Sequence, residues 1–112
     1  MVKLKPRFKL WLETEDGYVF GPGSFELLHG IQEEGSLTAA AKELKMSYRQ
    51  AWGIIKEIEE KLRRSILATY RGGNLGGGGA ELTQTGKELL ETYLKAKNEL
   101  TQMFSKIDSL EL

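Results

Sequence analysis

Hydrophobic residues recur at every second position near the start of the chain. Phe8, Leu10 and Leu12 occupy such positions, and Asp16-Gly17 follows them as a turn signal. Alternation of this kind is typical of a strand with one buried face, and Asp-Gly is a favoured hairpin turn. The pattern therefore predicts a β-hairpin over residues 6–20.

Helical spacing replaces the alternation after Gly21-Pro22-Gly23. Ser24 is expected to cap a first helix that ends at Gly35 and places three apolar residues on one face, namely Phe25, Leu28 and Ile31. Ser36 is expected to cap a second helix, LTAAAKELK, whose inner face holds Leu37, Ala40, Ala41 and Leu44. The small alanine side chains let another helix cross at a short distance.

A third helix is predicted directly after Met46, because Ser47-Tyr-Arg-Gln50 fits a capping box, in which the two end residues satisfy free backbone amides. Its apolar stripe consists of Ala51, Ile54 or Ile55, Ile58 and Leu62. Two short helices joined by so tight a turn match the helix-turn-helix signature. A helical hairpin without any DNA-binding role is the alternative at this point.

Six glycines fall within residues 72–79, between two β-like segments at Ser65–Tyr70 and Ala80–Thr83. A linker is disfavoured, because the roughly 30 residues beyond the run are too few for an independent domain. A nucleotide phosphate loop is also disfavoured, because Gly-Lys-Ser/Thr is missing and Glu81 would repel phosphate. The run is therefore interpreted as the tip of a β-wing, where glycines leave backbone amides free to meet DNA phosphates.

The last segment has the spacing of a long helix. Thr83 is expected to cap this helix. The segment covers residues 84–110, and its periodic pattern predicts a helix that ends at about residue 108. The stripe at heptad spacing consists of Leu90, Tyr93, Lys97, Leu100, Phe104 and Ile107. Because a helix longer than its domain's core exposes apolar surface, the stripe predicts a homodimer. A stripe that serves only the core of one chain is the alternative.

Composition narrows the function further. The 112 residues, 40% hydrophobic and 29% charged, fit one folded domain. With no cysteine and a single histidine, His29, for which we expect a structural role, the chain offers no recognisable metal site or catalytic pair. We expect no catalytic residue, no metal and no cofactor, and hence no enzyme. No stretch approaches the roughly 20 apolar residues that span a bilayer, so we expect a cytoplasmic protein without a membrane partner.

Charge is distributed unevenly although the formal net charge is zero. Residues 47–73 hold six Lys or Arg against three Asp or Glu, whereas residues 1–46 hold six against seven and residues 74–112 hold four against six. A nucleic-acid-binding face depends on such local excess rather than on the sum. The third predicted helix and the start of the wing are therefore the candidate DNA-binding region.

Two stretches, GSLTAAAKELKMSYRQAW and GGGGAELTQTG, resemble the N-terminal winged helix-turn-helix domain of ModE-type molybdate-responsive transcription regulators. The LysR-type family is also similar over residues 36–62 and LTQTGKELL. The resemblance implies a dimeric regulator with its recognition helix in the major groove and its wings on flanking DNA. The oxyanion-binding β-barrel domains of such regulators are expected to be absent because the sequence ends at Leu112, which leaves any small-molecule effector unknown.

The candidate DNA contacts lie in three places. The first turn of the third helix offers Ser47, Tyr48, Arg49 and Gln50, of which Arg49 is the first choice because arginine bonds bidentately to guanine. Gln50 is instead used up if its capping box forms, and Tyr48 covers the helix junction in the alternative interpretation. Thr38 and Lys56 are candidates for contacts with phosphate. The remaining candidates for contact with DNA are Trp52 and the wing residues Arg71, Gly72, Gly73 and Asn74.

Two interpretations stay open for Trp52 and for the basic residues at the end of the third helix. Trp52 lies against DNA or packs partly onto the first helix, and packing is favoured because aromatic side chains dominate core energetics. Lys61, Arg63 and Arg64 contact DNA or simply complement the negative end of their helix.

The sequence as a whole predicts a mainly α protein with a small β component. We expect a winged helix-turn-helix with an N-terminal β-hairpin, a core over residues 24–83 and a long C-terminal dimerisation helix, all in one domain of residues 1–112. The expected function is sequence-specific binding of double-stranded DNA as a homodimer on a pseudo-palindromic site. The alternatives are a winged-helix protein-interaction module and a LysR-type DNA-binding fragment without its own effector domain.

Overall fold

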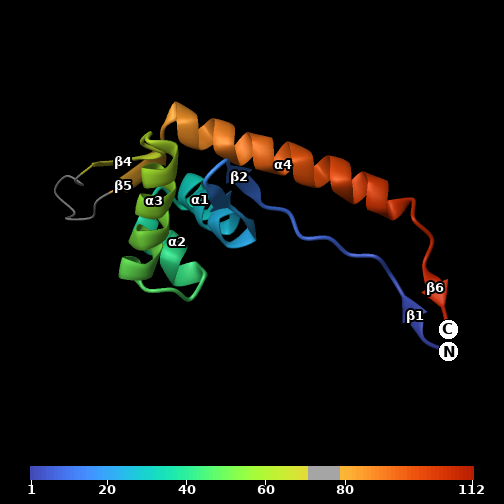
Figure 1. Ribbon diagram of the computed structural model, residues 1–112. Helices are drawn as coiled ribbons and strands as arrows, with labels where there is room; N and C mark the ends of the chain where they lie inside the picture. The colour runs from blue at the N-terminus through green and yellow to red at the C-terminus, as the bar shows by residue number, and fades with distance from the viewer. Residues whose placement is uncertain (71–78) are drawn as a thin grey trace.

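The computed structural model of the protein describes residues 1–70 and 79–112, which form four helices and three antiparallel strand pairs. The elements in chain order are β1 (Lys3–Leu4), β2 (Leu12–Thr14), β3 (Gly17–Phe20), α1 (Pro22–Glu34), α2 (Leu37–Glu43), α3 (Tyr48–Leu62), β4 (Leu67–Tyr70), β5 (Gly79–Leu82), α4 (Gln84–Ser105) and β6 (Leu110–Glu111). Figure 1 shows a lobe built from α1, α2, α3 and the β4–β5 pair, from which α4 runs to the far end of the molecule. The mainly α winged-helix class is confirmed.

The core of the lobe lies between the first three helices. Leu27, Leu28 and Ile31 of α1 are fully buried, as is Ile55 of α3. The alanine-rich face of α2 lets α1 approach closely, since a Cβ added at Gly30 of α1 would lie only 3.1 Å from the Cβ of Ala40. The predicted close helix crossing is therefore confirmed, and it holds α2 firmly against the scaffold that carries α3.

Three of the four predicted N-caps are confirmed. The side-chain oxygens of Ser36, Ser47 and Thr83 accept hydrogen bonds from the amides of Ala39 (3.1 Å), Gln50 (3.0 Å) and Gly86 (3.1 Å). Each bond satisfies one of the amides that a helix N-terminus leaves without a partner.

The predicted start of the first helix is wrong. The helix begins at Pro22, with Gly21 as its N-cap, and Ser24 is a buried residue inside the first turn. Proline is well suited to the first helical position, because its missing N–H has no partner there and its fixed φ is already helical. Gly35 ends the helix in the left-handed region, at φ 68°, as predicted.

The predicted hairpin over residues 6–20 forms only in its second half, between β2 and β3. The preceding residues instead extend along α4, where the Tyr93 hydroxyl donates to the carbonyl of Leu10 (3.0 Å) and the rings of Phe8 and Phe104 lie 4.7 Å apart. We call residues 5–11 the N-terminal arm. At the far end of α4, β1 pairs with β6, so that both chain ends lie together (Figure 1).

The final helix is three residues shorter than predicted. It ends at Ser105, so Ile107 lies beyond it and does not continue the helical stripe.

Burial raises the pKa of Tyr93, with smaller contributions from Tyr18 and Glu26, so its hydroxyl remains a hydrogen-bond donor to the arm. No helix in the described ranges is both long and apolar enough to cross a membrane.

Candidate nucleic-acid interface

The turn between α2 and α3 is fixed by backbone hydrogen bonds. The amide of Leu44 donates to Ala40 and Ala41, and the amide of Met46 also donates to Ala41 (3.0 Å). Lys45 adopts the left-handed conformation, at φ 59°, which redirects the chain within a single residue. The start of α3 is therefore held at a defined angle to α2.

The first turn of α3 is exposed, although the opposite side of the helix is buried. Ser47, Tyr48, Arg49 and Gln50 are all exposed, whereas Ala51, Ile55 and Ile58 belong to the core. In the described part of the chain only the serine half of the capping box forms, since the Gln50 side chain returns no hydrogen bond to Ser47. The amide of the Gln50 side chain thus remains available to a ligand.

Thr38 and Tyr48 line one hollow together with the base of the wing. The hollow has a volume of about 350 Å³, and its wall comes from the start of α2, the start of α3 and the β4–β5 pair. Thr69, Tyr70 and Gly79 supply the wing side of the wall. The structure therefore brings Thr38 of α2 and Tyr48 of α3 to the same concave surface as the base of the wing.

The two wing strands form as predicted, with Leu67 opposite Leu82 and Tyr70 opposite Gly79. A hydrogen bond from the amide of Ala80 to the carbonyl of Gly35 (2.9 Å) fixes the wing to the end of α1. Gly79 leaves room for the Tyr70 ring, since a Cβ there would clash with it. The predicted contacts Arg71, Gly72, Gly73 and Asn74 lie outside the described residues.

Trp52 and Lys56 are engaged in contacts within the chain. The rings of Tyr48 and Trp52 are stacked with centroids 6.4 Å apart and an angle of 8° between their planes. The Lys56 ammonium lies 4.5 Å from the centroid of the Trp52 ring and 3.2 Å from Oε1 of Glu59. Trp52 is half-buried and packs against the core, in line with the favoured packing interpretation.

Sequence reasoning missed Glu59, which joins α3 to the wing. Its Oε2 accepts hydrogen bonds from the amides of Ile66 (2.8 Å) and Leu67 (3.4 Å) and from the Ser65 hydroxyl (3.2 Å). Burial by itself raises the pKa of Glu59, but these amide bonds and the Lys56 ammonium outweigh it and hold the pKa below its ordinary value. The carboxylate thus stays charged where strand β4 begins.

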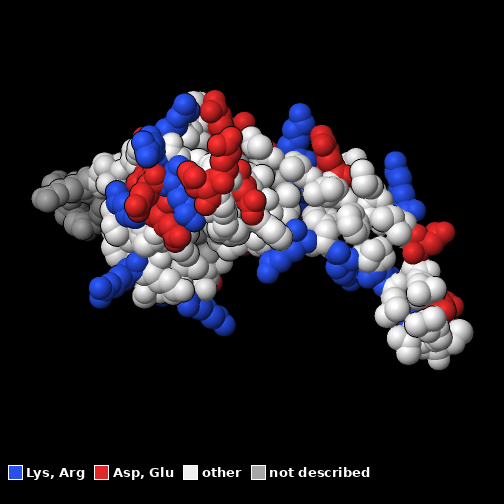
Figure 2. Space-filling view, viewed as in Figure 1, with Lys and Arg blue, Asp and Glu red and all other residues white. Residues whose placement is uncertain are grey.

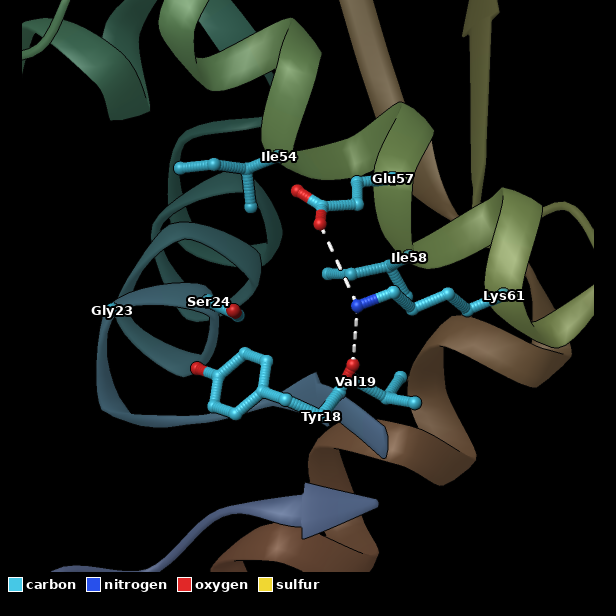
Figure 3. A pocket seen from close by; sticks show the side chains of 8 residues that line it. All are labelled: Tyr18, Val19, Gly23, Ser24, Ile54, Glu57, Ile58 and Lys61. Carbon is cyan, nitrogen blue, oxygen red and sulfur yellow. Dashed lines mark hydrogen bonds and ion pairs between the residues drawn. The ribbon is translucent and has the colours of Figure 1, made fainter. Parts of the chain in front are cut away.

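Lys61 was expected at a basic end of the recognition helix, but its ammonium is held within the chain. Figure 3 shows it between Glu57 and strand β3, donating to the carbonyl of Tyr18 (2.5 Å) and lying 3.5 Å from the Glu57 carboxylate. The contact closes one side of a pocket of about 240 Å³ between α1, β3 and α3. No sequence pattern indicates the bond between Lys61 and Tyr18, because these two residues are 43 positions apart. Arg63 is the C-cap residue of α3, at φ 55°.

The basic side chains of α3 differ in whether they pair with a carboxylate of the same helix. Acidic and basic side chains intermingle over the part of the lobe where α3 lies, and basic side chains project from the edge at which α2 is joined to α3 (Figure 2). Lys56 and Lys61 are paired with Glu59 and Glu57, whereas Arg49 takes part in none of the ion pairs found among the described residues. Of the three cations of α3, Arg49 in the first turn is therefore the one that the described ion pairs leave to meet an outside anion.

The predicted dimerisation stripe faces mostly its own chain. Leu90 and Tyr93 are buried in the core of the chain. The Lys97 ammonium lies 5.4 Å from the Phe25 ring centroid, and Phe104 is covered by Phe8 of the arm. Of the other two, Leu100 is half-buried and Ile107 is exposed beyond the helix. The N-terminal arm thus covers part of the predicted stripe, at Tyr93 and at Phe104.

His29 sits on the exposed side of α1, stacked at 5.9 Å on the ring of Phe25 and 3.6 Å from the Glu33 carboxylate. Within residues 1–70 and 79–112, no three acidic or histidine side chains are grouped so that they could hold a metal ion.

Two helices joined by a fixed turn, an exposed first turn on the second helix and an adjoining antiparallel strand pair define a winged helix-turn-helix of the DNA-binding kind. The chain belongs to the bacterial regulatory helix-turn-helix proteins of the lysR family, whose family model matches residues 23–87. The matched range runs from the start of α1 into the first turn of α4 and so contains the whole candidate interface.

Several curated proteins are similar over the same region. The DNA-binding transcriptional dual regulator ModE of Escherichia coli (strain K12) is 36% identical over 84 residues, which are 75% of this chain and 32% of that protein. The molybdenum transport protein ModE of Azotobacter vinelandii is 31% identical over 76% of this chain and 31% of its own length. The molybdenum-pterin-binding protein MopB of Rhodobacter capsulatus is 35% identical over 69% of this chain and 28% of its own length. The matched part thus spans about a third of these relatives, and it supports the ModE-like resemblance.

Proposed function

We propose that this chain reads a specific DNA sequence as a homodimer, with α3 in the major groove and the wing on flanking backbone or minor groove. The observation that carries the proposal is the exposed first turn of α3, whose four polar residues project from a helix that is otherwise anchored in the core. In a helix-turn-helix, the N-terminal residues of the second helix contact base edges. Family membership supports DNA binding and transcription regulation as the setting.

Arg49 is proposed as the principal base-reading residue. It is exposed and lacks an acidic partner among the described residues, so its guanidinium keeps its full donor set for a guanine edge. Gln50 can bond to adenine, because its side chain is not spent on the cap. Tyr48 and Thr38, which line the hollow between α2, α3 and the wing, are proposed to meet the backbone that enters it, and Ser47 at the N-cap of α3 remains a proposed contact. Arg71, Gly72, Gly73 and Asn74 remain proposed contacts of the wing tip.

The homodimer is proposed to form through apolar surface that the arm leaves uncovered. Met103, Ile107 and Leu110, close together along the chain at the far end of α4, are all exposed. Burial of such side chains against a second copy is the common way to satisfy an exposed apolar patch. A dimer would place two recognition helices on half-sites about 34–36 Å apart or a multiple of this spacing.

Selection of bound sequences from a random duplex pool tests the proposal. The wild-type protein is expected to enrich a pseudo-palindrome. Arg49→Ala should lower the affinity for that sequence by roughly 1–3 kcal/mol, the contribution of one bidentate contact to a base, and should change nonspecific binding much less. Arg49→Lys serves as the matched control, because it keeps the charge but loses the bidentate geometry, and it should recover nonspecific affinity without recovering the selected base. Equal losses on all duplexes for Arg49→Ala would show that the residue does not read bases.

A further inference from the structure

The contacts of Trp52, Lys56 and Glu59 form one continuous column of side chains along α3. Tyr48, Trp52 and Lys56 are spaced four residues apart and therefore lie on the same side of the helix. Tyr48 stacks on Trp52, the Lys56 ammonium covers the Trp52 ring at 4.5 Å, and Lys56 in turn pairs with Glu59 at 3.2 Å. The column begins in the exposed first turn, at the residues proposed to meet DNA.

The other end of the column is attached to the wing. Oε2 of Glu59 accepts the amides of Ile66 and Leu67, at the point where β4 starts. The same strand continues to Tyr70, which lines the hollow together with Tyr48. The reading turn and the wing thus line the same hollow, and Glu59 links α3 to the start of β4.

Lys56 occupies the middle of this column. Its ammonium has two partners in the protein, the face of Trp52 and the carboxylate of Glu59, and both are less exposed than the lysine itself. A cation over an indole is the most favourable form of cation–π contact. A DNA phosphate would have to compete with both partners for this ammonium, whereas Arg49 has no such competitor among the described residues.

We propose that the Tyr48–Trp52–Lys56–Glu59 column sets the orientation of the base-reading turn relative to the wing, and that Lys56 is a positioning residue for sequence discrimination instead of a phosphate contact. This inference rests on the proposed DNA-reading function. In the column, the lysine holds the Trp52 ring, the ring supports Tyr48 in the first turn, and Glu59 joins both to the start of β4.

The test uses the full chain in a Trp11→Phe background. The chain has two tryptophans, and Trp11 is an exposed residue bonded only to the nearby Glu13 among the described residues, so its replacement leaves Trp52 as the single tryptophan reporter. Lys56→Met keeps the apolar stem and removes the charge. Lys42→Met is the matched control, because Lys42 is an exposed lysine of the same helix-turn-helix and joins neither the ion pairs nor the cation–π contacts found in the described part of the chain. Glu59→Gln removes the negative charge but keeps an oxygen that can accept the amides of β4.

In the DNA-free protein, Lys56→Met is expected to raise quenching of Trp52 fluorescence by acrylamide and to shift its emission to longer wavelength, whereas Lys42→Met changes neither. On DNA, Lys56→Met is expected to reduce the preference for the selected duplex over a scrambled one by about fivefold, the size of a partly desolvated cation–π contact. Lys42→Met is expected to leave that preference unchanged. Glu59→Gln should alter Trp52 in the same direction, and the Lys56→Met/Glu59→Gln double variant should show less than the sum of the two single effects.

Two results would overturn the inference. One is an unchanged Trp52 signal in Lys56→Met. The other is an equal affinity loss on selected and scrambled duplexes, accompanied by a salt-dependence slope lower by about one, which marks a phosphate contact. If the wild-type protein prefers no duplex at all while Trp52 still responds to Lys56→Met, the column exists but the proposed DNA-reading function fails. The two failures are therefore distinguishable.

Discussion

Gly86, the third residue of α4, offers the sharpest test of how the wing is attached to the final helix. A Cβ added there would lie 2.3 Å from the carbonyl oxygen of Ile66, 3.2 Å from its carbon and 3.3 Å from the Cβ of Leu82. The Ile66 carbonyl cannot simply move away, because it accepts the amide of Thr83 at 3.0 Å at the point where α4 begins. Gly86→Ala must therefore displace backbone on both sides of this contact.

The sign of the effect is opposite to that expected from helix propensity. Alanine in place of a helical glycine stabilises a helix by up to about 1 kcal/mol. Overpacking of a closed site costs about 1–3 kcal/mol. Because the added Cβ would meet backbone atoms, we expect Gly86→Ala to lower the free energy of unfolding by about 2 kcal/mol, which corresponds to a fall in Tm of several degrees for a domain of this size. Gly53→Ala in α3 is the control, because its Cβ position has nothing within 4 Å apart from the neighbouring residues and backbone of its own helix, and it should gain most of the helical benefit.

Urea denaturation at one fixed protein concentration measures both variants. The transition midpoint should fall for Gly86→Ala and rise for Gly53→Ala, with slopes like that of the wild type. If Gly86→Ala were as stable as the wild type while Gly53→Ala gained stability, the close contact between α4 and the Ile66 carbonyl would be refuted.

Three further predictions concern the arm, the wing and the dimer. Tyr93→Phe removes the hydrogen bond to Leu10 and should cost about 1 kcal/mol while accelerating amide exchange in residues 8–12; unchanged exchange there would contradict the attachment of the arm to α4. Because the folded pKa of Glu59 lies below its ordinary value of 4.5, its contribution to stability is complete above that value and is lost as the pH falls through the folded pKa. Glu59→Gln should flatten the acid side of the stability–pH curve, and a curve that keeps its wild-type shape would count against this role. Met103→Glu should shift sedimentation from dimer to monomer, with Gln102→Glu as a control on the same helix, and a wild-type monomer would remove the proposed assembly.

The features that the sequence predicted correctly depend on neighbouring residues. Ser36, Ser47 and Thr83 cap their helices through bonds to amides three positions ahead, and this spacing is visible in the sequence itself. The wing strands were also predictable, because β-like residues flank a glycine run. The misplaced start of α1 was a local error, in which serine was preferred although Pro22 suits the first helical position.

The features that the sequence did not reveal depend on contacts between distant positions. The arm follows α4 because Tyr93 bonds to Leu10, 83 positions away, and alternation in residues 8–12 cannot distinguish this arrangement from a hairpin strand. The contact with the arm was hidden for the same reason, since heptad spacing indicates a face to be covered without indicating which segment covers it. Lys61 was missed for the same reason, because Tyr18 lies 43 positions away on β3. The partners of Glu59 are only six to eight positions ahead, but they lie past the end of α3, where helical spacing no longer applies.

The most direct test of the central claim maps the bound duplex onto the protein by amide chemical shifts, with the selected sequence as ligand. The largest changes are expected on Thr38, on residues 47–50 at the start of α3 and on the base of the wing at residues 69–70 and 79–80. Large changes confined to α4 and the N-terminal arm, with the first turn of α3 unaffected, would contradict that claim.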